Sequence, residues 1–103
     1  MPPMVPPFNL FFEVIFLESY SRLGSQEKKV IDKGVQLLAK NPRHPSLQVH
    51  KAKNITGKYP PGGDGVYIAY ASRDLRITFE YGPEQGMIAL RNCGHHASRE
   101  RNI

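Results

Sequence analysis

The hydrophobic and polar positions of residues 65–96 follow the two-residue period of β-strands. In the middle of this stretch the apolar set is Leu75, Ile77, Phe79 and Tyr81, and the polar set is Arg76, Thr78 and Glu80. Successive side chains of a strand point to opposite faces, so we expect the apolar set in a core and the polar set on an open face of the sheet. Similar patterns predict strands at about 65–71, 75–81 and 87–93, with a turn at 82–86 before the last.

The first half of the chain predicts one strand and two helices. Residues 9–16 are aromatic and β-branched, which favours a buried strand over a short helix. Three apolar residues then recur at helical spacing: Leu17, Tyr20 and Leu23. This short helix is expected to end at Gly24. A second helix is expected to follow Ser25 as its N-cap and to end before Pro42.

These elements occur in the order β-α-α-β-β-β-β. A basic loop at 43–53 leads into the second strand, and a Pro/Gly-rich connection follows at 54–65. We therefore expect an α+β fold, in which a helical hairpin packs on a mainly antiparallel sheet of four to five strands. The 103 residues suffice for one domain, which we place at 9–98, between a flexible Pro-rich leader at 1–8 and a tail at 99–103.

The charge of the chain and its cysteine content indicate which kind of partner it binds and in which cellular compartment it works. The net charge is +5, and the excess of Lys and Arg over Asp and Glu lies wholly in residues 40–103. A basic strand-forming half suggests a polyanionic partner such as RNA or DNA. The single cysteine, Cys93, excludes an internal disulfide, is expected to be a buried thiol and fits a reducing cytoplasm. The apolar run 10–17 is too short for a membrane span and lacks the flanks of a signal peptide, so no membrane partner is expected.

Three short motifs occur in one order along the chain. They are LLAKNPRHPSL at 37–47, SRDLRITF at 72–79 and LRNCGHH at 90–96. Together they resemble the RelE/ParE superfamily of toxins from bacterial and archaeal toxin–antitoxin pairs, over about residues 9–98. The resemblance implies a cognate antitoxin and a toxin–antitoxin hetero-oligomer. For the RelE-like branch it implies a metal-independent endoribonuclease, or mRNA interferase, that cleaves mRNA on the ribosome and inhibits translation.

The resemblance also implies roles for individual residues. Arg76 matches the arginine of the family's "Y-R-I/L" strand, which contacts the scissile phosphate in the nucleases. His96 matches the histidine of "G-x-H-D", which acts as general acid or base in several of them. Tyr70 and Asp74 lie where some branches place further active-site groups. Ala97 replaces the usual acidic residue after the histidine, which is a departure from the family pattern.

The residue types suit this chemistry. Imidazole titrates near neutral pH and can move a proton, whereas a guanidinium keeps its charge and its fork matches phosphate oxygens. We therefore expect Arg76 and His96 to be catalytic. The expected substrate-binding residues are Arg73, Arg91, His95, Tyr70, Lys51 and Lys53. Among them, Tyr70 has the ring needed to stack on a splayed base, and the two lysines suit contacts to the RNA backbone.

Two other functions fit the same sequence. The first is a ParE-like toxin that binds and poisons DNA gyrase, and the second is a catalytically inactive relic that still binds an antitoxin. A zinc site is not expected, because the spacing of Cys93, His95 and His96 matches no usual zinc motif. We accordingly expect no metal or other cofactor.

Overall fold

The computed structural model describes residues 7–53, 55, 57–59 and 65–95. Their elements are, in chain order, β1 Asn9–Phe12, α1 Val14–Ser21, α2 Ser25–Lys40, the short 3-10 helix η1 Pro45–Leu47, β2 His50–Lys51, β3 Tyr67–Tyr70, β4 Leu75–Tyr81 and β5 Met87–His95. The strands of these residues form one five-stranded sheet in the order β1-β5-β4-β3-β2. β1 is parallel to β5 and the other neighbours are antiparallel. The predicted α+β fold and element order are confirmed.

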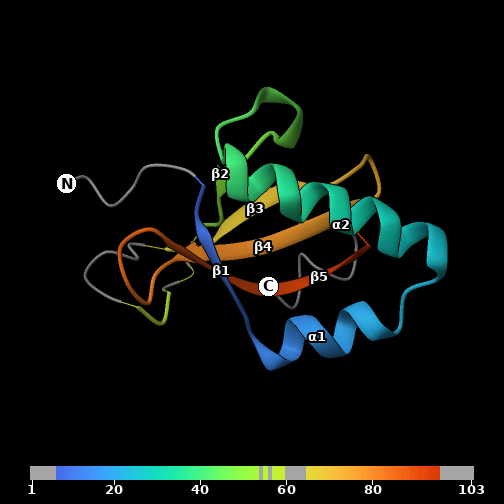
Figure 1. Cartoon of the computed structure of the whole chain (residues 1–103), viewed down its shortest axis with the longest axis horizontal. Helices are drawn as coiled ribbons and strands as arrows, with labels where there is room; N and C mark the ends of the chain where they lie inside the picture. Colours follow the sequence, from blue (N-terminus) through green and yellow to red (C-terminus); the bar gives the residue numbers. More distant parts are fainter. Residues whose placement is uncertain (1–6, 54, 56, 60–64, 96–103) are drawn as a thin grey trace.

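The main core lies between α2 and one face of the sheet. Figure 1 shows α2 lying across that face, and Ile31 and Leu38 of α2 are fully buried there with Ile77 and Phe79 of β4. A Cβ atom added to Gly34 would lie 2.9 Å from the Cβ of Ala71, so the helix approaches the sheet closely at this glycine. The alternation in 75–81 therefore assigns the core face correctly.

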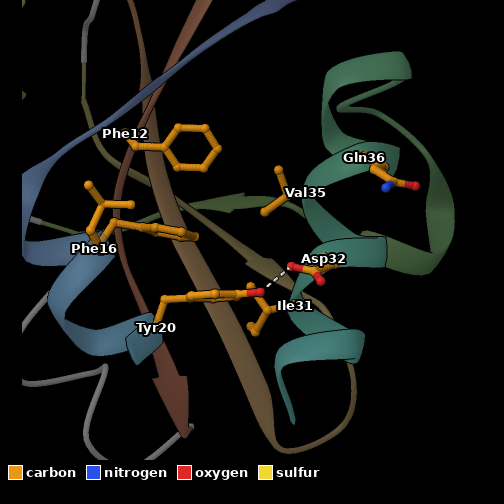
Figure 2. Close-up of a pocket in the computed structure, with 8 residues that line it drawn as sticks. Phe12, Phe16, Tyr20, Ile31, Asp32, Val35 and Gln36 are labelled. Carbon is orange, nitrogen blue, oxygen red and sulfur yellow. Dashed lines mark hydrogen bonds between the residues drawn. The ribbon is translucent and has the colours of Figure 1, made fainter. Parts of the chain in front are cut away.

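The beginning of the chain departs from the prediction. The predicted buried strand 9–16 is wrong, because β1 ends at Phe12 and α1 begins at Val14, before the predicted helix start at Leu17. Aromatic and β-branched residues favour strands only weakly, and tertiary contacts decide the state of so short a segment. α1 lies along β5, where Ser19 donates a hydrogen bond of 2.6 Å to Asn92. α1 also contacts α2, through the hydrogen bond from Tyr20 to Asp32 that Figure 2 shows.

The polar face of β4 is covered, which corrects the expectation of an open face. Arg76 is 3% exposed, and Thr78 and Glu80 are completely buried. A bulge in the β4–β5 pairing, between Thr78 and Phe79, makes Arg91 the extra residue on β5. Buried polar groups need partners, and each polar side chain of β4 makes a hydrogen bond within the protein.

The remaining predictions either agree with the structure or concern residues that the structure does not describe. Cys93 is buried, as predicted. His96, residues 1–6 of the leader, residues 60–64 of the connection and the 99–103 tail lie outside the described residues. In the part of the chain that the structure describes, no helix combines the length and apolar character needed to cross a membrane.

Candidate functional site

The centre of the candidate site is the pair Tyr70 and Arg76. The antiparallel register of β3 and β4 places these residues opposite each other on the sheet face that points away from α2. An Nη2–H of Arg76 donates to the hydroxyl of Tyr70 at 2.8 Å, and its Cζ lies 4.6 Å from the centroid of the Tyr70 ring. Since a phenol both donates and accepts, the O–H of Tyr70 can still donate to a ligand. The Tyr70 hydroxyl is therefore a hydrogen-bond donor available to a ligand, and it is held in place by the buried guanidinium of Arg76.

His50 extends this pair along the same sheet face. β2 pairs with β3 so that His50 lies opposite Ile68, two residues before Tyr70, and the two rings are 5.8 Å apart between centroids. The Nδ1 atom of His50 is 3.2 Å from the carbonyl oxygen of Gln48. In the tautomer that donates Nδ1–H to this carbonyl, Nε2 is left to accept a proton. His50 is exposed, so this nitrogen can meet a substrate.

A polar hollow of about 500 Å³ lies beside these residues. Its lining residues are Ser46, Gln48, Tyr70, Ser72 and Arg73. We call it the β3–β4 hollow. Arg73 is exposed in the turn between β3 and β4, and the other wall includes Ser46 of η1. The Nδ1 atom of His44 holds this wall, since it accepts a hydrogen bond from the backbone N–H of Ser46 at 3.1 Å. Hydroxyls, an amide and a guanidinium around one hollow suit a phosphate-bearing ligand.

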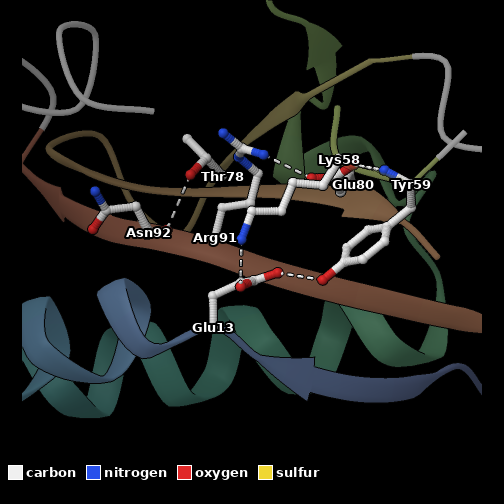
Figure 3. Close-up of polar contacts among 7 residues, drawn as sticks. All are labelled: Glu13, Lys58, Tyr59, Thr78, Glu80, Arg91 and Asn92. Atoms are coloured by element: carbon white, nitrogen blue, oxygen red, sulfur yellow. Dashed lines mark hydrogen bonds and ion pairs between the residues drawn. The ribbon is translucent and has the colours of Figure 1, made fainter. Parts of the chain in front are cut away.

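A second polar cluster on the same sheet face contains Glu13, Lys58, Tyr59, Glu80 and Arg91 (Figure 3). Arg91 Nη1 donates to the buried Glu80 carboxylate at 2.7 Å, and the backbone N–H of Tyr59 donates to the same carboxylate at 3.3 Å. Glu13 accepts from the Tyr59 hydroxyl at 2.7 Å and from Lys58 Nζ at 3.1 Å. These contacts fasten residues 58 and 59 to the sheet.

The same contacts shift the pKa values of Glu13 and Tyr59. Burial alone raises the pKa of Glu13, but the hydrogen bonds from Tyr59 and Lys58, with the nearby charges of Lys58 and Arg91, outweigh it and lower the pKa from its usual 4.5. The hydrogen bond to Glu13, followed by burial, raises the pKa of Tyr59 to about 12. At neutral pH this cluster therefore holds an ionised carboxylate and a neutral phenol.

Comparisons with known proteins show a likeness in structure and none in sequence. No protein-family model matches the chain, and no curated protein matches it in sequence. A chain of the archaeal RelE–RelB complex from Pyrococcus horikoshii superposes with a TM-score of 0.65 at 13% identity, over 86% of this chain and 94% of that one. A chain of the E. coli DinJ–YafQ toxin–antitoxin complex gives 0.64 at 12% identity, over 89% and 96%. The YoeB/ParE toxin from Agrobacterium tumefaciens gives 0.62 at 10% identity, over 85% and 98%.

This chain has the RelE-like toxin fold. The resemblance that the three sequence motifs suggested is thus confirmed at the level of the fold. The chain also spans nearly the whole length of each of these neighbours.

Within the RelE-like fold, the sequence-predicted site residues divide into groups. Tyr70 and Arg73 line the β3–β4 hollow and Arg76 is hydrogen-bonded to Tyr70, whereas Arg91 lies in the second cluster with Glu80. Lys51 and Lys53 are exposed at β2 and directly after it.

His95 lies apart from this hollow. It pairs with Leu75, whose side chain is in the core, so the side chain of His95 points to the α2 side of the sheet. There its Nε2 is 2.6 Å from Glu27. The structure therefore separates His95 from Arg76.

The sequence reasoning missed His50 and the two serines of the hollow. The alternation that located Arg76 covers seven residues, but β2 has only two and is joined to β3 through residues 52–66, so no pattern revealed its register. A histidine directly before Lys51 in a basic stretch was the available signal. Among the described residues, no group of three or more His, Cys, Asp or Glu side chains is placed to hold a metal ion.

Proposed function

We propose that this chain is the toxin of a type II toxin–antitoxin system and that it cleaves mRNA, on the ribosome, without a metal ion. Three features support the proposal: the RelE-like fold, the basic second half of the chain and the polar β3–β4 hollow. The observation that carries it is the hydrogen bond from Arg76 to Tyr70 at the edge of this hollow. Cleavage of mRNA stops translation, so a cognate antitoxin must restrain the chain until it is needed.

The reaction requires a base, an acid and stabilisation of charge on the phosphate. The 2′-oxygen attacks the neighbouring phosphorus as its proton passes to a base. The bond from phosphorus to the 5′-oxygen then breaks as an acid protonates that oxygen, which leaves a 2′,3′-cyclic phosphate and a 5′-hydroxyl. We assign the two proton transfers to His50 and His96, and we assign phosphate binding to Arg73.

Charge stabilisation is the role of Tyr70 and Arg76. Tyr70 lines the hollow and donates its O–H to a non-bridging phosphate oxygen, while Arg76 holds the phenol from below. Arg76 is 3% exposed, so water screens its charge weakly, and its hydrogen bond to the phenol oxygen makes the O–H of Tyr70 a stronger donor. Arg76 is thus a positioning residue, because it acts on the phosphate through Tyr70.

The test is to map the ends of a defined mRNA after incubation with the purified chain, both free and on programmed ribosomes. Tyr70→Phe is expected to slow cleavage roughly 100-fold, the size of effect seen when one donor to a developing negative charge is removed. The loss should fall on kcat, with KM unchanged, whereas Arg73→Ala should raise KM. Tyr81→Phe is the matched control, because Tyr81 is a half-buried tyrosine on the opposite sheet face.

Arg76 and the histidines need their own variants. Arg76→Lys keeps a cation but loses the guanidinium fork, and it should lower kcat while the melting temperature stays near that of the parent. His50→Ala and His96→Ala should each lower kcat by about 10²–10⁴-fold, the size of effect expected when one general acid or base is removed. Absence of cleavage in both settings by a folded chain would refute the nuclease, and supercoiling by purified gyrase would then test the gyrase-poison alternative.

A further inference from the structure

The segment that follows α2 carries an arginine that is available to a ligand. Asn41 is the C-cap of α2, and its Oδ1 accepts the backbone N–H of Arg43 at 3.1 Å. The N–H of His44 donates to the backbone carbonyl of Asn41 at 3.0 Å, so two hydrogen bonds fix the backbone of residues 41–44. The Arg43 side chain is exposed and forms no hydrogen bond or ion pair with any residue that the structure describes. Its guanidinium can therefore bind an anion.

Arg43 lines a pocket of about 580 Å³, a volume typical of small-molecule sites. The lining includes Phe8, Asn41, Arg43, Tyr67 and Tyr81. We call it the α2-end pocket, because α2 ends here beside the start of β1 (Figure 1), where the N–H of Phe8 donates to the carbonyl of Ala39 at 2.8 Å. The aromatic residues of the pocket pack together: the ring centroid of Tyr81 is 5.5 Å from that of Tyr67 and 5.9 Å from that of Phe8. The pocket thus combines an aromatic wall with a cation.

The polar groups beside the rings are mainly hydrogen-bond donors. The Oδ1 of Asn41 already accepts the Arg43 N–H, so the amide nitrogen is left to donate, and a guanidinium carries donors alone. Burial, followed by the nearby hydroxyl of Tyr67, raises the pKa of Tyr81, and the charge of Arg43 acts in the opposite direction. The guanidinium is therefore close enough to the rings to bind the same ligand that they contact. A matching ligand has a flat ring with acceptors on its edge, and a negative charge.

We propose that the α2-end pocket binds a nucleoside monophosphate. The base packs against the rings of Tyr67 and Tyr81, and the phosphate accepts hydrogen bonds from Arg43. The amide of Asn41 donates to an acceptor on the edge of the base, which a plain aromatic ring does not offer. The two tyrosines act here through their rings and not through their hydroxyls. The proposal rests on this pocket alone and not on the proposed nuclease function.

The α2-end pocket and the β3–β4 hollow lie on opposite faces of the sheet. Tyr67 packs on the main core, whereas Tyr70, three residues further along β3, points away from α2. Residues 41–49 contribute to both sites, with Arg43 in the pocket and Ser46 in the hollow. A nucleotide in the α2-end pocket therefore leaves the hollow open, and it is expected to leave RNA cleavage unchanged.

The probe is guanosine 5′-monophosphate (GMP), whose base carries a carbonyl acceptor. Its binding to the full chain is measured by amide chemical shifts, which give both the dissociation constant and the location. We expect a Kd below about 1 mM, with shifts at the amides of Arg43 and Val49, which line the pocket. Guanosine lacks the phosphate and ribose 5-phosphate lacks the base, so each should bind at least about tenfold more weakly than GMP.

Variants of exposed arginines test the role of Arg43 without disturbing the core. Arg43→Ala should weaken GMP binding about tenfold, to the level of guanosine, and change guanosine binding by less than about twofold. Arg43→Lys keeps the charge but loses the fork that matches two phosphate oxygens, so its affinity should lie between the two. Arg22→Ala is the matched control: Arg22 is exposed after α1 and does not line the pocket, so GMP affinity should stay within about twofold of the parent.

Four results would overturn the proposal. They are no binding at millimolar GMP, equal losses for Arg43→Ala and Arg22→Ala, equal affinity for N-acetyltyrosine (an aromatic carboxylate without phosphate), and a loss with Arg73→Ala but not with Arg43→Ala, which would place GMP in the β3–β4 hollow. A 2′-O-methyl RNA with guanine in mid-strand distinguishes the sources of the nucleotide: shifts at the same amides assign it to an RNA strand, and their absence assigns it to the free nucleotide. RNA cleavage is measured separately, so failure of the pocket and failure of the nuclease are distinguishable.

Discussion

At the scale of single residues, the ion pair of Glu80 and Arg91 is the clearest test of stability. The Glu80 side chain is fully buried and Arg91 lies 2.7 Å from it. Arg91→Ala leaves a buried carboxylate without its cation, which is expected to cost about 3–5 kcal/mol in the free energy of unfolding, as measured by urea denaturation. Arg22→Ala, at an exposed position after α1, should change this free energy by less than about 0.5 kcal/mol.

A double variant separates two possible causes of the stability loss in Arg91→Ala: the unpaired charge of Glu80 and the lost packing of the Arg91 side chain. Glu80→Gln with Arg91→Ala removes the buried charge but keeps an acceptor for the Tyr59 N–H, so it should be more stable than Arg91→Ala alone. A double variant that is less stable than Arg91→Ala would mean that packing, not the buried charge, dominates the loss.

The residue scale also shows what the sequence could and could not predict. Alternation in 75–81 correctly divided Ile77 and Phe79 from Arg76 and Glu80, because strand geometry fixes which side chains share a face. It could not show that the polar face is covered, since that depends on residues distant in sequence. Tyr59, which contacts Glu80 across 21 positions, is an example.

At the scale of elements, the beginning of α2 is held by one carboxylate. The N-cap is Gly24, not the predicted Ser25, and it has no side chain to accept from the helix. Glu27 ties the helix start to the sheet, because its Oε1 accepts the Gly24 N–H at 2.8 Å while its Oε2 lies 2.6 Å from His95 at the end of β5. The hydrogen bond from Gly24, followed by that from His95, lowers the pKa of Glu27 below its usual 4.5.

This lowered pKa sets the direction of a pH effect. A carboxyl whose pKa is lower in the folded state stabilises the fold fully above its unfolded pKa, and the stabilisation is lost as the pH falls through the folded value. Glu27→Gln should therefore destabilise the chain at pH 7, and its difference from the parent should shrink below about pH 4.5. Glu18→Gln, at an exposed carboxylate of α1, is the control for thermal melting across this range, and a parallel pH dependence for both variants would contradict the assignment.

Elements differ in how far the sequence predicted them. α2, β4 and β5 were located to within a few residues, because each is long enough for its period to show. The boundary between β1 and α1 was not, since residues 9–16 are apolar at nearly every position and carry no period. The apolar run that obscured this boundary overlaps the segment that contains the exposed side chains of Phe11, Phe12, Val14, Ile15 and Leu17.

At the scale of the whole molecule, the two faces of the sheet carry different side chains: α2 and the main core cover one face, and Tyr70 and Arg76 lie on the other. The helices expose apolar groups and lysines, and on the far sheet face Tyr70 and Arg73 line the β3–β4 hollow while the buried Arg76 is hydrogen-bonded to Tyr70. The sequence pointed to the far sheet face because alternation and the resemblance of residues 72–79 both singled out Arg76. The exposed apolar side chains of residues 11–17 were found only in the folded chain, because exposure depends on contacts between residues distant in sequence.

The charge of +5 gives a whole-molecule prediction about RNA binding, because each phosphate contact made by a cation releases counterions. For a short 2′-O-methyl RNA, which lacks the attacking hydroxyl, we expect the logarithm of the binding constant to fall linearly with the logarithm of salt concentration. Arg73→Ala should reduce the magnitude of this slope by about 0.7, the value of one phosphate contact on a single strand. Arg22→Ala should leave the slope unchanged.

The salt dependence of RNA binding also tests whether Arg91 belongs to the RNA-binding site. The sequence favoured it as a phosphate ligand, but in the structure its guanidinium binds Glu80 and its side chain is 19% exposed. A cation that is already neutralised by a buried carboxylate releases few counterions when RNA binds. Arg91→Ala, measured at a temperature where the variant is folded, should therefore keep the slope of the parent. A reduction as large as that of Arg73→Ala would show that RNA competes with Glu80 for Arg91, and the binding surface would then extend from the β3–β4 hollow to the second polar cluster.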